Sequence, residues 1–157
     1  MGLVLLTLVM LLGLAGAGAA RIELLLAQNE TFRENAASAA SAGIEMAISE
    51  IVGSPNPEVV DTLVTGRMTG ATFEAQVRFV GFDNALPQEP AARLAGAHFE
   101  ILSTGRSARH ALDRQRAGVM WVVDAPGEVD SADCEPVVLR HCHQRGQLER
   151  LYWQRVP

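Results

Sequence analysis

The fold is decided by one stretch near the start of the chain, Leu3–Val52, which reads LVLLTLVMLLGLAGAGAARIELLLAQNETFRENAASAASAGIEMAISEIV. Its first eighteen residues carry no charge, and no proline occurs before Pro55. The simplest interpretation is one continuous helix, which at 1.5 Å per residue would be a rod of roughly 75 Å. A domain of about 100 residues has a radius of gyration of only ~13 Å, so such a rod cannot be buried in one. Part of it must therefore lie in another environment, such as a membrane or a polymer of copies.

The apolar run Leu3–Ala20 has three interpretations. As a membrane anchor, it is at the lower limit for crossing a hydrocarbon layer about 30 Å thick, with Arg21 at the water interface. As a cleaved secretory signal, it would be cut at an Ala-x-Ala site, and the mature chain would begin at Gly18 or Ala20. No Lys or Arg precedes the run and the helical pattern continues past both sites, which favours the anchor. A buried core helix is the third interpretation, but eighteen uncharged residues are long for one.

Beyond Arg21 the helical pattern becomes two-sided. Polar residues recur at spacings of three, four or seven from Glu23 to Ser49, which places them on one stripe. The opposite side is made mostly of small residues, and small residues let another backbone approach closely. We expect this side to contact neighbouring helices through Phe32, Ala36, Ala39, Ala40, Gly43 and Ala47. Gly53 and Pro55 predict the end of the helix.

After the helix the hydrophobic period changes from about 3.6 to 2, which predicts β-strands. Four strands are expected, at residues 73–79, 98–103, 118–123 and 148–156, with a strand or helical turn at 59–64. The strand at 118–123 is the most apolar and is expected to be central. Residues 81–96 are expected to form a loop and residues 104–107 a turn, while the charges of residues 108–116 argue against a central strand.

Consecutive strands with short turns imply an antiparallel sheet that packs one face on the long helix. The predicted fold class is therefore α+β, with a long N-terminal helix of about residues 3–52 packed on a small antiparallel β-sheet. The expected organisation is a transmembrane half-helix at 3–20, an amphipathic half at 21–53, and a sheet domain at 54–157 with a cysteine-closed loop near its C-terminus.

The composition excludes some classes of function. The chain has 157 residues, a formal net charge of -5 and a pI near 5.3. An acidic chain of this kind is not expected to bind nucleic acid, which selects basic faces. No Ser, Cys or carboxylate stands in a recognisable nucleophile motif, and no phosphate-binding glycine loop is present. We therefore expect no catalytic residues, no metal site and no cofactor.

The two cysteines, Cys134 and Cys142, are close together in the sequence. In an exported chain such a pair usually closes a disulfide, which for this loop length would stabilise the fold by roughly 2–3 kcal/mol. A zinc site that also used His141 and His143 is the alternative. Adjacent residues in a strand point to opposite faces, and there is no C-x-x-C pair, so the disulfide is the preferred interpretation.

The helix carries a motif that resembles a known family. Residues 29–34, NETFRE, are followed by Ala36 and by residues 39–47, AASAGIEMA. This is similar to the pattern of PilX-type minor pilins of type IV pili, which runs N-E-x-x-R and then A-x-x-A-A-E-A-G-(L/I)-E-x-A. Residues 99–105, FEILSTG, resemble a strand and turn of such proteins. The resemblance covers residues 2–52 well and residues 98–123 loosely.

The resemblance implies a structural role. Such a subunit primes, or is incorporated in, a type IV pilus, here near its tip. Its partners would be other minor and major pilins, a tip adhesin and the inner membrane, which it would cross once with its domain in the periplasm. Two alternatives stay open: a pseudopilin of type II secretion, which shares this plan, and a secreted binding domain with a cleaved signal peptide.

Three features depart from the family pattern. Members carry a basic leader ending in Gly, whereas only Met1 and Gly2 precede the run here; the expected cut between Gly2 and Leu3 would make Leu3 the mature N-terminus. Major pilins have a Glu at the fifth mature position, which is Thr7 in this chain. Subunits without that carboxylate include those thought to cap the filament. Ser41 stands where the motif has an acidic residue.

Overall fold

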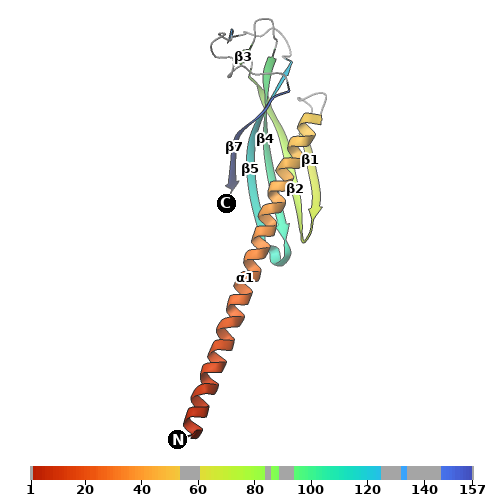
Figure 1. Cartoon of the computed structure of the whole chain (residues 1–157). Helices are drawn as coiled ribbons and strands as arrows, with labels where there is room; N and C mark the ends of the chain where they lie inside the picture. The colour runs from red at the N-terminus through yellow and green to blue at the C-terminus, as the bar shows by residue number, and fades with distance from the viewer. Residues whose placement is uncertain are drawn as a thin grey trace.

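The computed structural model of the chain describes residues 2–53, 61–83, 86–88, 94–124, 132–133 and 146–156. These residues form one long helix, α1 (Gly2–Gly53), and a five-stranded β-sheet. The sheet lies against the C-terminal part of α1 only, while the N-terminal part extends away from the domain as a free rod (Figure 1). This confirms the α+β fold, with a long N-terminal helix packed on an antiparallel sheet.

The main sheet is a meander in which every neighbouring pair is antiparallel. Its strands, in spatial order, are β1 (Asp61–Met68), β2 (Ala71–Asp83), β4 (Leu94–Ser107), β5 (Leu112–Asp124) and β7 (Leu148–Val156). A second, two-residue pairing joins β3 (Pro87–Gln88) to β6 (Ala132–Asp133) in parallel. The central strand is therefore β4, and β5, which contains the apolar run at 118–123, lies beside it.

The structure differs from the sequence-based expectation in the β4–β5 region, where the predicted turn is wrong and β5 begins earlier than expected. The expected turn at 104–107 belongs to β4, and the true turn is the 3₁₀ segment η2 (Ala108–His110). Residues 112–116 extend β5 despite their charges. The reason is that the charged residues of this segment alternate with inward-facing ones: Arg114 and Arg116 project on the solvated face, while Gln115 and Ala117 are buried. An antiparallel sheet with one solvated face accepts charges in an inner strand. The expected loop at 81–96 is also shorter, because β2 continues to Asp83 and β4 begins at Leu94.

The main core lies between α1 and the facing side of the sheet. Alternate residues of β2, as predicted, point inward, and the same side of the inner strands contributes Phe99, Ile101 and Val119. They pack against Ile44 and Ile51 of α1. Three aromatic rings extend this core edge to face, with the Phe79 ring centroid 5.0 Å from that of Phe82 and 5.6 Å from that of Phe99.

A smaller core lies on the opposite face of the sheet. Met120 and Val122 of β5 are buried there with Leu94 and Leu86. Residues 118–123 are thus apolar on both faces of the strand. This explains their uninterrupted hydrophobicity without a central position in the sheet.

Candidate functional site

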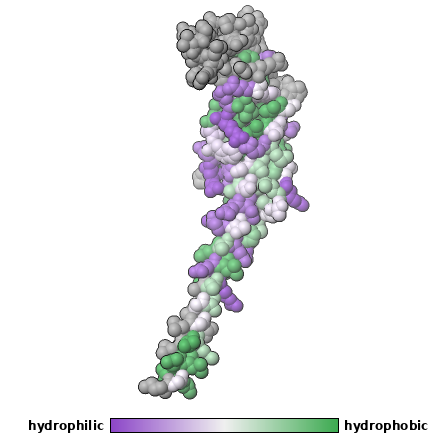
Figure 2. Space-filling view, viewed as in Figure 1, coloured by the Kyte–Doolittle hydropathy of each residue, from purple (hydrophilic) through white to green (hydrophobic). Residues whose placement is uncertain are grey.

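The free part of α1 is the most unusual surface of the molecule. Its most apolar 18-residue window has a mean hydropathy of 2.3 and none of it is buried in the domain. Leu3 is 77% exposed and Leu26, beyond the first charged residues, is still 63% exposed. Figure 2 shows hydrophobic side chains at the free end of the rod, and a mixture of polar and hydrophobic side chains over the sheet domain. By length and composition, this helix is long and apolar enough to cross a membrane or to act as a signal sequence.

The predicted cleavage residues, Gly2 and Leu3, are the first residues of α1 and lie at its free end. Thr7 is also on the exposed rod, and its hydroxyl donates a hydrogen bond to the Val4 carbonyl oxygen at 2.8 Å. The hydroxyl is thus satisfied within the helix, which lets a polar residue sit in an otherwise apolar surface. Glu23 is the first carboxylate along the rod.

The small-residue face of α1 has a different partner from the one expected. Ala36, Ala39, Ala40 and Ala47 are fully buried, and Gly43 is buried with them, against the sheet of the same chain. The prediction that this face contacts neighbouring helices is therefore corrected. A small-residue stripe permits close approach by any backbone, and here that backbone is β4 and its neighbours. A charged substitution at Ala40 would disrupt the domain itself rather than report on assembly.

Glycines define the closest approach of helix and sheet. A β-carbon built on Gly105 of β4 would lie 2.6 Å from the Ala40 backbone nitrogen and would overlap the Ala36 carbonyl oxygen. The Phe73 ring fills the next space along, covering Gly66 of β1. Its edge also reaches Gly43, where an added β-carbon would lie 2.9 Å from the ring. The small face of α1 is therefore shaped to the side chains of its own sheet.

Phe32, the remaining residue of the predicted face, lies where α1 leaves the domain and is only partly buried. The guanidinium of Arg109, in the β4–β5 turn, lies 5.7 Å from its ring centroid. The same guanidinium donates long hydrogen bonds to Asn29 Oδ1 at 3.4 Å and Gln28 Oε1 at 3.5 Å. Arg109 thus fixes the tip of the hairpin to the helix.

A buried polar cluster joins α1 to the β7 side of the sheet. Its centre is Gln115, which is only 5% exposed. Gln115 Nε2 donates to the Ala37 carbonyl oxygen at 3.1 Å, and Gln115 Oε1 accepts from Ser41 Oγ at 3.0 Å and from Trp153 Nε1 at 2.9 Å. Asp113 Oδ2 accepts a further bond from Nε2 at 2.8 Å. This accounts for Ser41, which departs from the family motif: its hydroxyl reaches the amide of Gln115.

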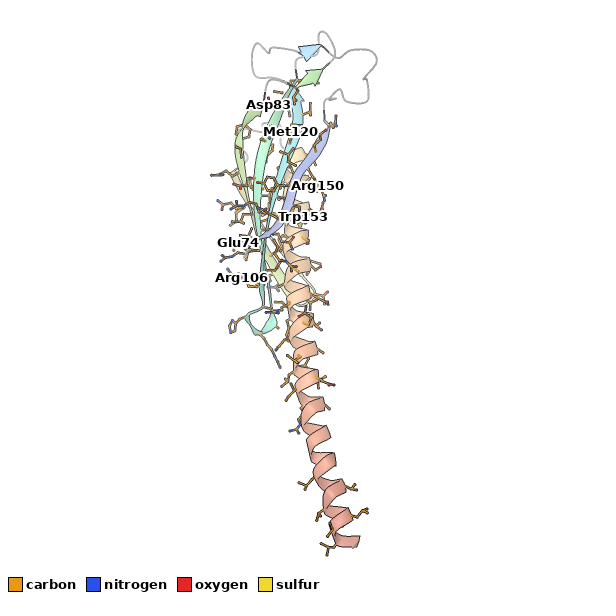
Figure 3. The ribbon with its side chains drawn as sticks, turned by 90° about the vertical axis from the view of Figure 1, so that its left-hand side faces the viewer. Glu74, Asp83, Arg106, Met120, Arg150 and Trp153 are labelled. Carbon is orange, nitrogen blue, oxygen red and sulfur yellow. The ribbon has the colours of Figure 1, made fainter. Side chains whose placement is uncertain are left out.

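A β-bulge in β7 creates the outer part of the same contact. Gly118 pairs with Tyr152 and Val119 pairs with Arg150, so Leu151 is an extra residue. Because of this extra residue, Arg150 and Trp153 both face α1. Arg150 Nη2 donates to both carboxylate oxygens of Glu45, each at 2.7 Å, and the Arg150 guanidinium lies 5.2 Å from the Trp153 ring centroid. Figure 3 shows Arg150 and Trp153 together on β7 beside the helix.

Tyr152 projects to the solvated face, where it meets a charged cluster. Its ring covers Gly118, and its hydroxyl lies 3.5 Å from Glu100 Oε1. Glu100 in turn pairs with Arg78 at 2.7 Å and Arg116 at 3.3 Å. Partial burial, followed by the repulsion of the Glu100 carboxylate, raises the pKa of Tyr152 above its ordinary value of 10.0.

The predicted disulfide between Cys134 and Cys142 lies outside the described residues. Within the described ranges, no group of three or more His, Cys, Asp or Glu side chains is placed to hold a metal ion. These parts of the chain present an apolar rod, a rigid junction between helix and sheet, and a charged sheet face.

Sequence reasoning missed the polar cluster at Gln115. Nothing in the local pattern distinguishes Gln115 from an exposed residue, since it is flanked by Arg114 and Arg116. The one available indication was the period of 2, which puts Gln115 on the same face as Ala117 and Val119.

The chain was compared with known proteins. It matches no family of known proteins, no curated protein sequence and no solved structure.

Proposed function

We propose that the protein is a structural subunit of a type IV pilus, a minor pilin of the PilX type that acts near the filament tip. The observation that carries the proposal is the free half of α1. It is long and continuous with the docked half, and residues Leu3–Ala20 carry no charge on any side, yet its own domain covers none of the most apolar window. Such a surface requires a hydrophobic host.

The motif at residues 29–47 supports the pilus over other hosts. In this proposal the rod first holds the subunit in the inner membrane, as a single-pass anchor with the domain in the periplasm. It later lies among the helices of other minor and major pilins. Thr7, in place of a carboxylate at that depth, suits a subunit that does not have to neutralise the terminal amine of a neighbour above it.

The rigid junction between α1 and the sheet supports a structural rather than a catalytic role. Force applied to the rod reaches the domain through the buried Gln115 cluster and through the close contact of Gly105 with Ala36. The remaining surfaces, including the predicted cysteine loop at Cys134–Cys142, would face other minor pilins or a tip adhesin. A pseudopilin of type II secretion is built on the same plan. Copurification of the protein with pilus components or with secretion components would distinguish these two functions.

The first test is N-terminal sequencing of the mature protein. We expect the mature chain to begin at Leu3, which leaves the whole apolar rod in place. A start at Gly18 or Ala20 would contradict the proposal, because removal of the apolar run would leave a secreted domain. Flotation of the full chain with membranes after a high-salt wash is expected on the same grounds.

The second test separates assembly from folding with two exposed leucines. Leu25 lies on the rod beyond the apolar run, and Leu63 lies on the solvated face of β1. Leu25→Arg should abolish recovery of the protein in sheared pili while its thermal unfolding temperature stays unchanged. Leu63→Arg is the matched control and should leave recovery intact. Equal recovery of the two variants would contradict a packing role for the rod.

A further inference from the structure

The end of the domain nearest the free rod is rich in arginine, although the whole chain carries a net charge of -5. On the solvated face, Arg67 of β1 and Arg106 of β4 flank Thr72, since Arg67 pairs with Thr72 and Thr72 with Arg106. The three residues border a surface hollow of about 370 Å³. Arg114 of β5 pairs with Thr104 and lies on the same face, two residue pairs further along the sheet. Figure 3 shows Arg106 at the end of the sheet where the rod departs.

The positive charges of Arg67, Arg106 and Arg114 are not neutralised by ion pairs within the described part of the chain. In the parts of the chain that the structure describes, no carboxylate forms an ion pair with Arg67, Arg106 or Arg114. Glu74 lies on the same face, in the row in which Thr104 separates it from Arg114. On the helix side of this end, Asp113 is paired with Arg155 at 2.9 Å, and Glu30 and Glu34 of α1 border a surface hollow together with Arg114.

The tip of the β4–β5 hairpin adds two more basic side chains in an unfavourable backbone conformation. Arg109 has φ 53° and His110 has φ 61°, the left-handed region in which a hairpin normally places Asn or Gly. Ser107 Oγ donates to the Gly70 carbonyl oxygen at 2.9 Å, which joins this hairpin to the β1–β2 turn. The two turns therefore form one rigid basic surface, which we call the basic end: Arg67, Arg106, Arg109, His110 and Arg114.

The geometry of α1 sets the distance from the basic end to a membrane. A helix that rises 1.5 Å per residue crosses a hydrocarbon layer of about 30 Å in about 20 residues, here from Gly2 to Arg21. The headgroup region adds roughly 5–7 Å on each side, or about four residues, which reaches Leu25. Ile22, Leu24 and Leu25 are exposed along this part of the rod. The hairpin tip touches Gln28 and Asn29, only about one helical turn further on.

We propose that the basic end rests on the anionic phospholipid headgroups of the membrane that holds α1. The remaining gap of about 5 Å is shorter than the Debye length of about 8 Å at physiological ionic strength. Juxtamembrane arginines are attracted to anionic headgroups over this range. The rest of the domain is net acidic and is repelled by the same surface, so the two effects orient the domain in the same sense. The inference rests on the membrane anchorage proposed above.

The test uses the full chain reconstituted in vesicles of phosphatidylcholine alone or of phosphatidylcholine with phosphatidylglycerol. A fluorophore is placed at Thr69, in the β1–β2 turn, through a bioorthogonal amino acid, and energy transfer to a headgroup-labelled lipid is measured. We expect transfer to increase severalfold with phosphatidylglycerol and the increase to disappear in high salt. Flotation of the same vesicles shows separately whether the chain is anchored, so failure of the anchor and failure of the orientation are distinguishable.

Matched variants identify the residues. Arg67→Gln with Arg106→Gln should abolish the response to phosphatidylglycerol. Gln76→Glu with Gln154→Glu makes the same change in net charge about 13 Å higher on the same face, four strand residues away, and should retain most of the response. Both pairs are exposed, and unchanged thermal unfolding temperatures check the fold.

Three results would overturn the proposal. One is transfer that does not depend on phosphatidylglycerol in an anchored chain. Another is an equal loss of response in both double variants, which would reflect net charge and not the basic end. The third is abolition of the response by inorganic phosphate at constant ionic strength, which would assign Arg67 and Arg106 to a discrete phosphate site.

Discussion

Gly105 of β4 lies directly beneath the backbone of α1 at Ala36, so closely that a β-carbon on Gly105 would overlap the Ala36 carbonyl oxygen. The obstacle is helix backbone, which cannot turn aside as a side chain does. Gly105→Ala should therefore push α1 away from the sheet and lower the free energy of unfolding by about 3 kcal/mol, at the upper end of overpacking effects. Guanidinium denaturation of the detergent-solubilised full chain, followed by tryptophan fluorescence, measures the change.

Gly53→Ala is the control for that variant. Gly53 is the last residue of α1, and a β-carbon built there meets no atom within 4 Å. Its free energy of unfolding should change by no more than about 0.5 kcal/mol. If Gly105→Ala were tolerated as well as Gly53→Ala, the close contact between α1 and β4 would be refuted.

The elements with a local sequence pattern could be predicted. The long helix follows from an uninterrupted run without proline, and β2 follows from strict alternation around Phe73 and Val77. The partner of the small-residue face could not be predicted, because alanines spaced along a helix admit either a helix or a sheet. The sheet is the partner because Gly105 lets β4 approach the helix backbone closely. Gly105 lies more than sixty residues away and looks like a turn residue in the sequence.

The register of β7 could not be predicted from its sequence for a similar reason. Alternation predicts that Leu151 and Trp153 share one face, opposite Arg150. The bulge at Leu151 instead puts Arg150 and Trp153 together against α1. The extra residue opposes Gly118 and Val119 of β5, so its position depends on cross-strand pairing and not on the local sequence of β7.

Ser103 is a buried residue whose removal should stabilise the protein. Its side chain faces Gly43, is fully buried, and its Oγ has no hydrogen-bond partner among the described residues. An unsatisfied buried hydroxyl costs about 1–3 kcal/mol. Ser103→Ala should therefore raise the free energy of unfolding by roughly 1 kcal/mol, at the low end of this range, because some packing contacts are lost.

Ser107→Ala provides the matched comparison on the same strand. Its Oγ donates to the Gly70 carbonyl oxygen at 2.9 Å, so this variant should lose about 0.5–1.5 kcal/mol. The two serine variants should thus differ in sign when unfolded under the same conditions. A loss at Ser103 as large as that at Ser107 would mean that the Ser103 hydroxyl has a partner.

The Gln115 cluster should contribute more to stability than the Arg150–Glu45 ion pair. Gln115→Ala leaves Trp153 Nε1 without an acceptor in a part-buried position and removes one of the two side-chain donors to the Ala37 carbonyl, the other being Ser41 Oγ, so it should cost about 2 kcal/mol. In the ion pair, the Arg150 and Glu45 side chains are 46% and 50% exposed, and solvent weakens such pairs.

Glu45→Gln should accordingly cost no more than about 1 kcal/mol, and less in high salt. The comparison is made by denaturation of both variants at low and high salt. If the order were reversed, α1 would be held to β7 mainly by surface charge, and the buried amide would be a minor contact.

Tyr152 is the only tyrosine in the chain, so the ultraviolet absorbance of tyrosinate reports its ionisation alone. Burial and then Glu100 raise its pKa above 10.0, while Arg116 acts in the opposite direction. Glu100→Gln should therefore lower the midpoint of the absorbance titration toward the ordinary value. Arg116→Gln should raise the midpoint, and a shift of the same sign in both variants would refute the electrostatic cause.

The same shift has a consequence for stability. The unfolded chain loses the tyrosine proton near pH 10, whereas the folded chain retains it to a higher pH. Between these two values the unfolded state binds fewer protons, so the free energy of unfolding falls as the pH rises. The contribution of Tyr152 is thus complete below pH 10 and is lost as the pH passes the folded-state pKa. Tyr152→Phe should remove this alkaline dependence, and a dependence that persisted unchanged would have to come from another group.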